Sequence, residues 1–189
     1  MARPRSETKR HFILQAAVKL FAEEGLNAST LRIAKQAGVA EGTIFTYFES
    51  KDELLNQLYL YLKGQLRLTL TSPGEPTPIR EQIWKAWQSY VNWGVANPAE
   101  HEVLAKLALS TSITDATRAE GNQTFCDVSL MLETARSSGV LQNQPIEFVG
   151  AIMGSMGDVT MSFMRASPAS ADKICSDGFN AFWKAISTA

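Results

Sequence analysis

The amino-acid sequence predicts an all-α fold of about nine helices. Apolar residues recur at helical spacing in nearly every segment, whereas alternating runs of β-branched residues, which are typical of strands, are absent. Residues that start helices, such as Ser and Asn, and residues that end them, such as Gly and Pro, recur along the chain. The 189 residues are enough for one small and one larger module.

The first predicted helix covers residues 6–24, and Gly25 is expected to end it in the left-handed conformation. Its apolar residues follow the spacing i, i+3, i+4, i+7 and i+8, which places them on one face. These residues are Ile13, Ala16, Ala17, Leu20 and Phe21. The stripe predicts that the helix packs along this face against a core.

Two short helices joined at a glycine are predicted next. The first begins after Ser29 or Thr30 as N-cap, and the second covers residues 41–48. Gly38 between them can adopt the positive φ that the turn of a helix-turn-helix requires. The residues expected to hold the two helices at their crossing angle are small or apolar: Ile33, Ala34, Ala37, Val39, Ile44 and Phe48.

A longer helix is predicted after Ser50, where Glu53 would complete a capping box, and it runs towards Leu70. Residues 72–78 contain three prolines and one glycine, and this segment excludes a helix before Pro78. We therefore predict three parts: a helix-turn-helix domain at residues 1–50, a connecting helix at 51–72 and a larger domain at 73–189. The larger domain is expected to contain helices at residues 79–96, 98–111, 115–138, 145–166 and 170–187.

The charges are unevenly distributed, although the net charge is only −1. Residues 1–35 contain seven basic and three acidic side chains, a balance of +4, whereas residues 66–189 contain nine basic and twelve acidic, a balance of −3. A positive first part suits a surface that meets phosphate, with Arg3 and Arg5 as an arm for the minor groove. A solvated terminus is the alternative for these charges.

Several classes of protein are disfavoured. No stretch approaches the roughly 18 apolar residues of a membrane span, and the first ten residues do not resemble a secretory signal. Cys126 and Cys175 predict two reduced, buried thiols in a cytoplasmic protein, with a redox pair as the alternative. His11 and His101 belong to no zinc or nucleophile motif, and no phosphate-binding loop occurs. We therefore predict no enzyme activity, no metal and no cofactor.

The most informative segment covers residues 29–55. Its motif consists of Ile33-Ala34, Ala37-Gly38-Val39, Gly42-Thr43, Tyr47-Phe48, Ser50-Lys51 and Leu54-Leu55, with Ala17, Leu20-Phe21 and Gly25 upstream. These residues resemble the DNA-binding domain of TetR-type transcriptional repressors. The resemblance covers about residues 6–60, and the rest of the chain matches the family only in length, helix count and all-helical character.

The resemblance implies roles for the outward-facing residues. Thr43, Tyr47 and Lys51 match family positions that contact phosphate, and Thr30 would bind phosphate through its hydroxyl and amide groups. The residues at positions that face base edges in the major groove are Glu41, Gly42, Phe45 and Thr46. The alternatives are that Tyr47 is a packed aromatic residue and that Lys51 is ordinary solvated surface.

Three residues depart from the family pattern. Arg32 stands where an acidic residue is common, Ala40 where a serine is frequent, and Phe45 where a tyrosine is frequent. We therefore expect the shared fold but take no operator sequence from the family.

The larger domain is expected to hold a small ligand. The candidate residues are Trp84, Trp87, Gln88, Leu104, Leu107, Arg118, Phe125 and Met131. Ligand pockets are mostly apolar with a few placed polar groups, which Gln88 and Arg118 would supply here. The alternative is that the apolar candidates are core residues at helical spacing.

Residues 145–187 are expected to form a dimer interface, mainly because the resemblance implies one. The candidates are Gly150, Met153, Gly154, Gly157, Met161, Phe179, Phe182 and Trp183. Each glycine costs a helix roughly 1 kcal/mol, so three of them at i, i+4 and i+7 favour the close approach of another helix. Packing of this face within one subunit is the alternative.

Together these features predict a cytoplasmic, DNA-binding transcriptional regulator. The family's usual form is a repressor, and we expect a small, largely apolar effector to release this one from a pseudo-palindromic operator. The predicted partners are double-stranded operator DNA, a small-molecule effector and a second copy of the chain, with no membrane partner. The alternatives are a ligand-dependent activator, a co-repressed regulator and, in another class, a helical protein-interaction module.

Overall fold

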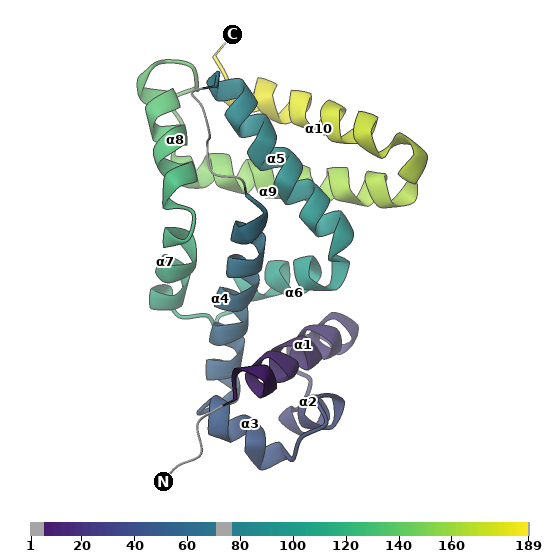
Figure 1. The fold of residues 1–189 in the computed structure, drawn as a ribbon. Coiled ribbons are helices and arrows are strands. Elements are labelled where there is room, and N and C mark those ends of the chain that lie inside the picture. The colour runs from purple at the N-terminus through teal and green to yellow at the C-terminus, as the bar shows by residue number, and fades with distance from the viewer. Residues whose placement is uncertain (1–5, 71–76, 189) are drawn as a thin grey trace. The chain divides into compact units, whose positions relative to one another are not determined.

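The computed structural model describes residues 6–70 and 77–188, and these residues form helices without a β-sheet (Figure 1). The α-helices are α1 (Glu7–Glu24), α2 (Thr30–Gln36), α3 (Glu41–Tyr47), α4 (Lys51–Thr69), α5 (Ile79–Ala96), α6 (Pro98–Leu109), α7 (Asp115–Gln123), α8 (Cys126–Ser137), α9 (Ile146–Ala166) and α10 (Ala171–Ile186), with a 3-10 helix, η1 (Pro168–Ser170), before the last. The predicted all-α fold is confirmed. The predicted breaker at residues 72–78 lies outside the described residues except for Thr77 and Pro78.

The helix predicted at residues 115–138 is two helices in the structure. The first, α7, ends at Gln123, and α8 begins at Cys126 after Phe125, whose φ of −113° and ψ of 23° are not helical. The break falls where the chain passes from one compact unit to another, so the two halves pack against different partners. The described residues therefore contain ten α-helices where about nine were predicted.

The described chain packs as two compact units. The first contains the described residues up to Gly64 together with Asn97–Asn122, and the second contains Gln65–Ala96 and the described residues from Gln123 onward. Helices α6 and α7 thus belong to the same unit as α1, α2 and α3. The predicted division at residues 1–50, 51–72 and 73–189 stays a prediction about function, because these units are defined by packing alone.

In the first unit, the apolar stripe predicted on α1 is buried, and Ile13, Ala17 and Phe21 are fully inaccessible. Helix α6 lies against α1 (Figure 1), and Nζ of Lys106 donates hydrogen bonds to the carbonyl oxygens of Phe21 and Ala22 at 3.3 and 3.4 Å. The last carbonyls of a helix have no partner within the helix, and a cation there also complements the helix dipole. Lys106 therefore ties α6 to the C-terminal end of α1.

A buried amide, Asn56 of α4, is also part of the first unit, and only 7% of its surface is exposed. Its Nδ2 donates hydrogen bonds to the carbonyl oxygens of Asp52 and Ser112, both at 2.8 Å. Its Oδ1 accepts a hydrogen bond from the backbone N–H of Thr114 at 3.0 Å. Both polar atoms of the amide are thereby satisfied, and the side chain fixes the connection between α6 and α7 on α4.

The core of the second unit is built mainly by α5, α9 and α10. Trp87 of α5 is fully inaccessible, and its ring stacks on Phe182 with 5.4 Å between ring centroids and 15° between ring planes. The indole Nε1 donates a hydrogen bond to the carbonyl oxygen of Cys175 at 3.2 Å. Because its one polar group is satisfied, Trp87 can bury its large ring without a desolvation penalty.

The two cysteines are not joined by a disulfide. The prediction that both thiols are buried is correct for Cys175 in α10 but wrong for Cys126, which is exposed at the start of α8. Burial raises the pKa of the Cys175 thiol, so this group stays in its less reactive protonated form at neutral pH.

Candidate nucleic-acid interface

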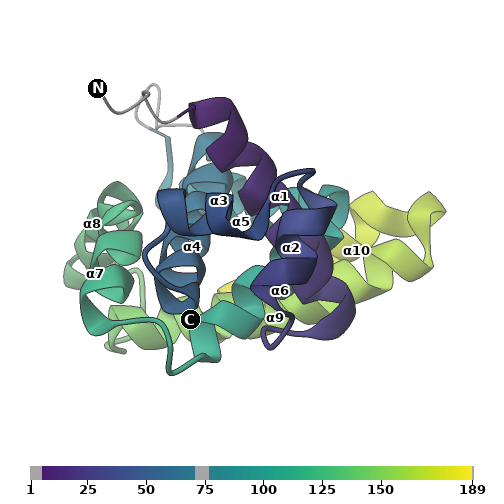
Figure 2. The same ribbon diagram turned by 90° about the horizontal axis from the view of Figure 1, so that it is seen from below.

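Helix α2, the turn at Gly38 and α3 form the predicted helix-turn-helix (Figure 2). Gly38 has a φ of 68°, a left-handed conformation that glycine adopts without steric cost. The space between the helices is filled by Ile33, Ala34 and Ile44, which are all buried, and Phe48 is buried directly after α3. The face of α3 predicted to point inward therefore does so.

The opposite face of α3 is open to solvent. Its residues Glu41, Gly42, Phe45 and Thr46 are exposed, while Thr43 and Tyr47 are half-buried. Phe45 leaves 47% of its surface exposed, although burial would stabilise such a ring. The face combines one carboxylate, several hydroxyls and aromatic rings. Hydroxyls can donate to phosphate oxygens, and a ring can contact a thymine methyl group in the major groove.

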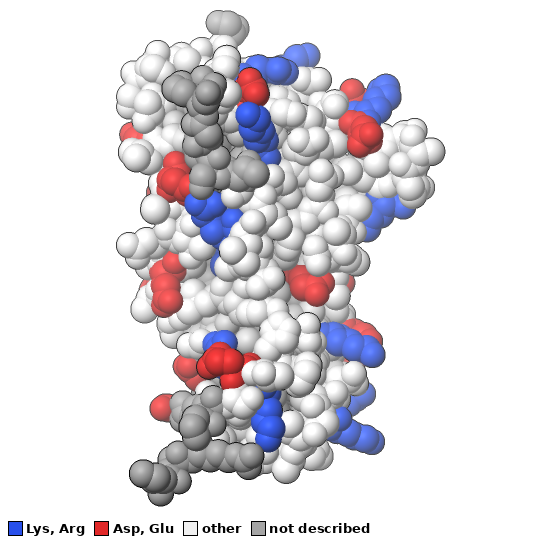
Figure 3. All heavy atoms as spheres, in the orientation of Figure 1, with Lys and Arg blue, Asp and Glu red and all other residues white. Residues whose placement is uncertain are grey.

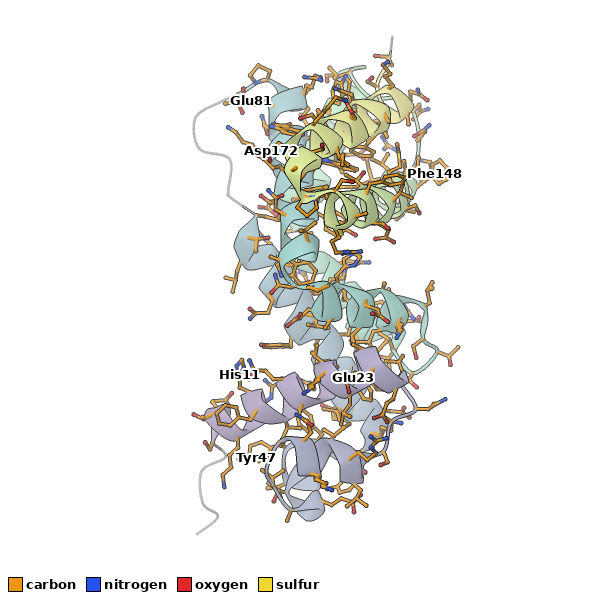
Figure 4. The ribbon with its side chains drawn as sticks, turned by 90° about the vertical axis from the view of Figure 1, so that its right-hand side faces the viewer. His11, Glu23, Tyr47, Glu81, Phe148 and Asp172 are labelled. Atoms are coloured by element: carbon orange, nitrogen blue, oxygen red, sulfur yellow. The ribbon has the colours of Figure 1, made fainter. Side chains whose placement is uncertain are left out.

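Tyr47 is fixed at the C-terminal end of α3 by the start of α1 (Figure 4). Its Oη accepts a hydrogen bond from the backbone N–H of Ser6 at 3.1 Å. The hydroxyl keeps its own proton in this bond, so it can still donate to an outside acceptor such as a phosphate oxygen. Arg3 and Arg5, which precede Ser6 in the sequence, lie outside the described residues.

Helices α2 and α3 are also linked at their N-terminal ends. Oγ1 of Thr30 donates a hydrogen bond to Oε1 of Glu41 at 3.0 Å. Thr30 follows the N-cap Ser29, whose Oγ accepts a hydrogen bond from the backbone N–H of Arg32 at 3.4 Å. The Arg32 side chain, which departs from the family pattern, forms an ion pair with Glu24 of α1.

Lys51 begins α4 and is half-exposed, as a phosphate contact requires. The helix start is well defined, because Oγ of Ser50 accepts a hydrogen bond from the backbone N–H of Glu53 at 3.1 Å. Arg10 of α1 is held against α4 by a hydrogen bond from Nη2 to Oε1 of Gln57 at 2.8 Å. The position of Lys51 is thus set by a capped helix that packs on α1.

The charge around the helix-turn-helix is mixed. Lys and Arg side chains lie over α1 and α2 on the face shown in Figure 3, at its lower right. Helix α3 itself has no basic residue and one acidic residue, Glu41, whereas Lys35 on α2 and Lys51 on α4 flank it in sequence. Attraction to phosphate must therefore come from the elements on either side of α3.

The candidate ligand residues are divided between the two units. Leu104, Leu107 and Arg118 belong to the first unit, and Trp84, Trp87, Gln88, Phe125 and Met131 belong to the second. Trp87 and Leu107 are fully inaccessible core residues, and Gln88 is exposed. The guanidinium of Arg118 donates to the carbonyl oxygens of Ala108 and Ser110 at the C-terminal end of α6. A ligand role for these residues stays a prediction.

The candidate dimer residues differ in exposure. Met161, Phe179 and Phe182 are buried within the second unit, Met153, Gly154 and Trp183 are half-buried, and Gly150 is exposed. Gly157 faces Tyr90 of α5, because a Cβ at this position would lie 2.5 Å from Cε1 of the tyrosine ring. At Gly157 the close approach is therefore between α9 and α5 of the same chain.

Several residues that matter for these surfaces were missed by the sequence analysis. On α9, Phe148, Val159 and Phe163 are exposed by 53%, 59% and 62%, and Figure 4 shows Phe148 at the edge of the molecule. Their separations of eleven and four residues place them on one helix face, a signal that the sequence contains. The roles of Asn56 and Lys106 depend on partners more than fifty residues away, which no local pattern indicates.

Comparison with known proteins agrees with this geometry. Residues 13–58 match the model of the family described as bacterial regulatory proteins, tetR family. An uncharacterised helix-turn-helix transcriptional regulator of Haemophilus influenzae is 34% identical over 131 residues, which cover 68% of each chain. The chain belongs to the tetR family of bacterial regulatory proteins.

Solved tetR-family structures extend the likeness to the whole chain. A regulator from Shewanella sp. PV-4 has a TM-score of 0.86 at 25% identity, covering 98% of this chain and 100% of its own. One from Marinobacter aquaeolei VT8 has a TM-score of 0.89 at 22% identity, covering all of both chains. Members of the tetR family are transcription regulators and not enzymes, as predicted for this chain. None of the helices in the described ranges has the length and apolar character needed to cross a membrane.

Proposed function

We propose that this tetR-family chain is a repressor that binds a pseudo-palindromic operator as a homodimer and leaves it when a small, largely apolar ligand binds. The observation that carries the proposal is the open face of α3, where Phe45 and Thr46 are exposed opposite the buried Ile44. A short helix that buries one face and presents hydroxyls and rings on the other has the form of a recognition helix for the major groove.

In this proposal the residues divide into two groups. Thr43, Tyr47 and Lys51 contact phosphates and set the position of α3, and the free proton of the Tyr47 hydroxyl supports that role. Gly42, Phe45, Thr46 and Glu41 face the base edges. A Cβ at position 42 would meet no neighbouring group within 4 Å, so the backbone of α3 can approach the DNA closely there.

Replacing Lys51 by alanine is expected to weaken DNA binding uniformly across sequences. Each phosphate contact contributes to the salt dependence of the affinity, so the slope of log K against log salt should fall by about 1 for each subunit. The measurement is the affinity for a duplex selected from a random library with the full chain, at several salt concentrations. Lys173→Ala on α10 is the matched control, and an unchanged slope in Lys51→Ala would remove this residue from the interface.

A second copy of the chain is the proposed occupant of the exposed apolar face of α9. Phe148, Val159 and Phe163 lie on that face, and monomers rarely leave such a group of large apolar side chains in water. A dimer also presents two recognition helices, whose separation must be roughly 34–36 Å to enter successive major grooves. The buried candidates Met161, Phe179 and Phe182 would support this face from beneath.

Replacing Val159 by lysine is expected to convert the dimer into a monomer, because a charge in the centre of an apolar interface loses its hydration without gaining a partner. Sedimentation velocity at micromolar concentration measures the change. Asn92→Lys, at an exposed site on α5, adds the same charge and should leave the dimer intact. A wild-type chain that sediments as a monomer, or a Val159→Lys dimer, would contradict the proposed interface.

The release step is proposed by analogy with the family and is tested in the same DNA-binding assay. A ligand can shift the balance only by its different affinities for the free and the DNA-bound form. Hydrophobic compounds that lower operator affinity would support repression with release. Compounds that raise operator affinity would instead identify a co-repressed regulator.

A further inference from the structure

The hydrogen bond between Thr30 and Glu41 determines what the first residue of α3 can recognise. The two side chains come from different helices of the helix-turn-helix, and Oγ1 of Thr30 lies 3.0 Å from Oε1 of Glu41. Thr30 is the first residue of α2 and Glu41 is the first residue of α3, so the carboxylate lies at the N-terminal end of the recognition helix. Glu41 is also exposed, which leaves its second oxygen open to a partner.

The chemistry of the pair limits its partners. A threonine hydroxyl has one proton, and here Thr30 gives that proton to Glu41. Phosphate oxygens only accept hydrogen bonds, so this hydroxyl cannot donate to a phosphate while it holds the carboxylate. An ionised carboxylate likewise only accepts, and phosphate repels it. Of the groups that DNA presents in the major groove, only the amino donors on base edges can therefore form a hydrogen bond with the open oxygen of Glu41.

The major groove offers two such donors, the N4 amino group of cytosine and the N6 amino group of adenine. In adenine the amino group lies beside the N7 acceptor, and guanine presents two acceptors, O6 and N7, so both purines place lone pairs near a carboxylate. Cytosine presents its amino group without a neighbouring acceptor on the same base. The carboxylate is therefore best matched to cytosine.

We infer that Glu41, oriented by Thr30, selects a C·G base pair at one position of each half-site. The inference rests on the proposed DNA-binding function and deepens it, because it names the base that one residue reads. Thr30 acts as a positioning residue through Glu41, and its hydroxyl does not contact phosphate. Glu41 is the only carboxylate on α3, so no second acidic side chain of that helix competes for the same role.

The test begins with duplexes selected from a random library by the full wild-type chain. Each base pair of the selected half-site is then changed in turn, and affinities are measured for wild type, Glu41→Gln, Thr30→Val and Thr30→Ser. Wild type should prefer C·G over the other pairs at one position by about five- to tenfold. Glutamine, which donates and accepts, should move the preference at that position to A·T.

The Thr30 variants separate positioning from folding. Thr30→Val removes the hydroxyl with little change in shape and should reduce the C·G preference to below about twofold, because Glu41 loses its fixed orientation. Thr30→Ser keeps the hydroxyl and should restore the preference. Glu23→Gln, which removes the same charge from an exposed site on α1, is the matched control and should leave the base preference unchanged.

The outcomes distinguish this inference from the proposed function. If wild type enriches no duplex, the DNA-binding proposal fails, and the inference fails with it. If wild type binds a selected site but Glu41→Gln keeps every base preference, only the assignment of Glu41 is overturned. If Glu41→Gln changes the preference and Thr30→Val does not, the positioning role of Thr30 is overturned.

Discussion

Replacing Trp87 by alanine is expected to lower the free energy of unfolding of the second unit by about 3–5 kcal/mol, the range for large aromatic residues truncated in a core. The ring is fully inaccessible and stacks on Phe182, so its removal leaves a cavity between α5 and α10. It also leaves the carbonyl oxygen of Cys175 without the indole donor. The loss is a large fraction of the total stability of an ordinary domain.

Urea unfolding followed by far-ultraviolet circular dichroism measures this effect without depending on tryptophan fluorescence. Gln88→Ala, at the next and exposed position of α5, is the matched control and should change stability by less than about 0.5 kcal/mol. Equal unfolding midpoints for the two variants would show that Trp87 lines an open space in solution, as a ligand-pocket residue would, and does not fill a closed core.

Replacing Asn56 by alanine is expected to destabilise the first unit by about 2–4 kcal/mol, because three hydrogen bonds of a buried amide are lost and each contributes about 0.5–1.5 kcal/mol. The carbonyl oxygen of Ser112 and the N–H of Thr114 both lose the amide that now satisfies them. Hydrogen exchange should therefore accelerate first at the amide groups around Thr114. DNA affinity should fall as well, since α4 carries Lys51 at its start.

Two controls accompany this prediction. Gln65→Ala removes an exposed amide from the same helix and should leave both stability and exchange unchanged. Asn56→Asp keeps the acceptor for Thr114 but places an oxygen opposite the carbonyl of Ser112, so it should be destabilising like the alanine variant. A stable Asn56→Asp protein would contradict the argument that the donated hydrogen bonds hold this connection.

The helices that could be predicted are those whose pattern is local. The stripe on α1 repeats at the helical period, and Gly38 marks a turn that needs a positive φ, so both were predicted from neighbouring residues alone. The break between α7 and α8 was missed because no proline interrupts residues 115–138. It is set by packing, since Gly121 of α7 lies against Tyr59 and a Cβ there would come within 2.7 Å of the ring.

The candidate site shows the same limit. Ile44 and Phe48 are four residues apart, and this spacing predicted that they share the buried face of α3. The residues on the opposite, exposed face could therefore be predicted from the sequence. The bond between Thr30 and Glu41 crosses the turn and depends on the angle between two helices, which no spacing indicates. For Phe179 and Phe182, the spacing identifies a face that becomes buried, but not whether a second copy or the same chain covers it.

The way the first unit is assembled has a consequence for engineering hybrid regulators. Helix α6 is attached to α1 through Lys106, and the segment that follows it is attached to α4 through Asn56. A transplant that joins residues 1–50 of this chain to a relative's remaining sequence would separate Lys106 from its acceptors on α1, whereas the position of Asn56 and those of its partners would all come from the relative. Exchanges that carry Asn97–Asn122 together with the described residues up to Gly64 should give hybrids that fold stably, whereas a cut at residue 50 should give hybrids of lower stability.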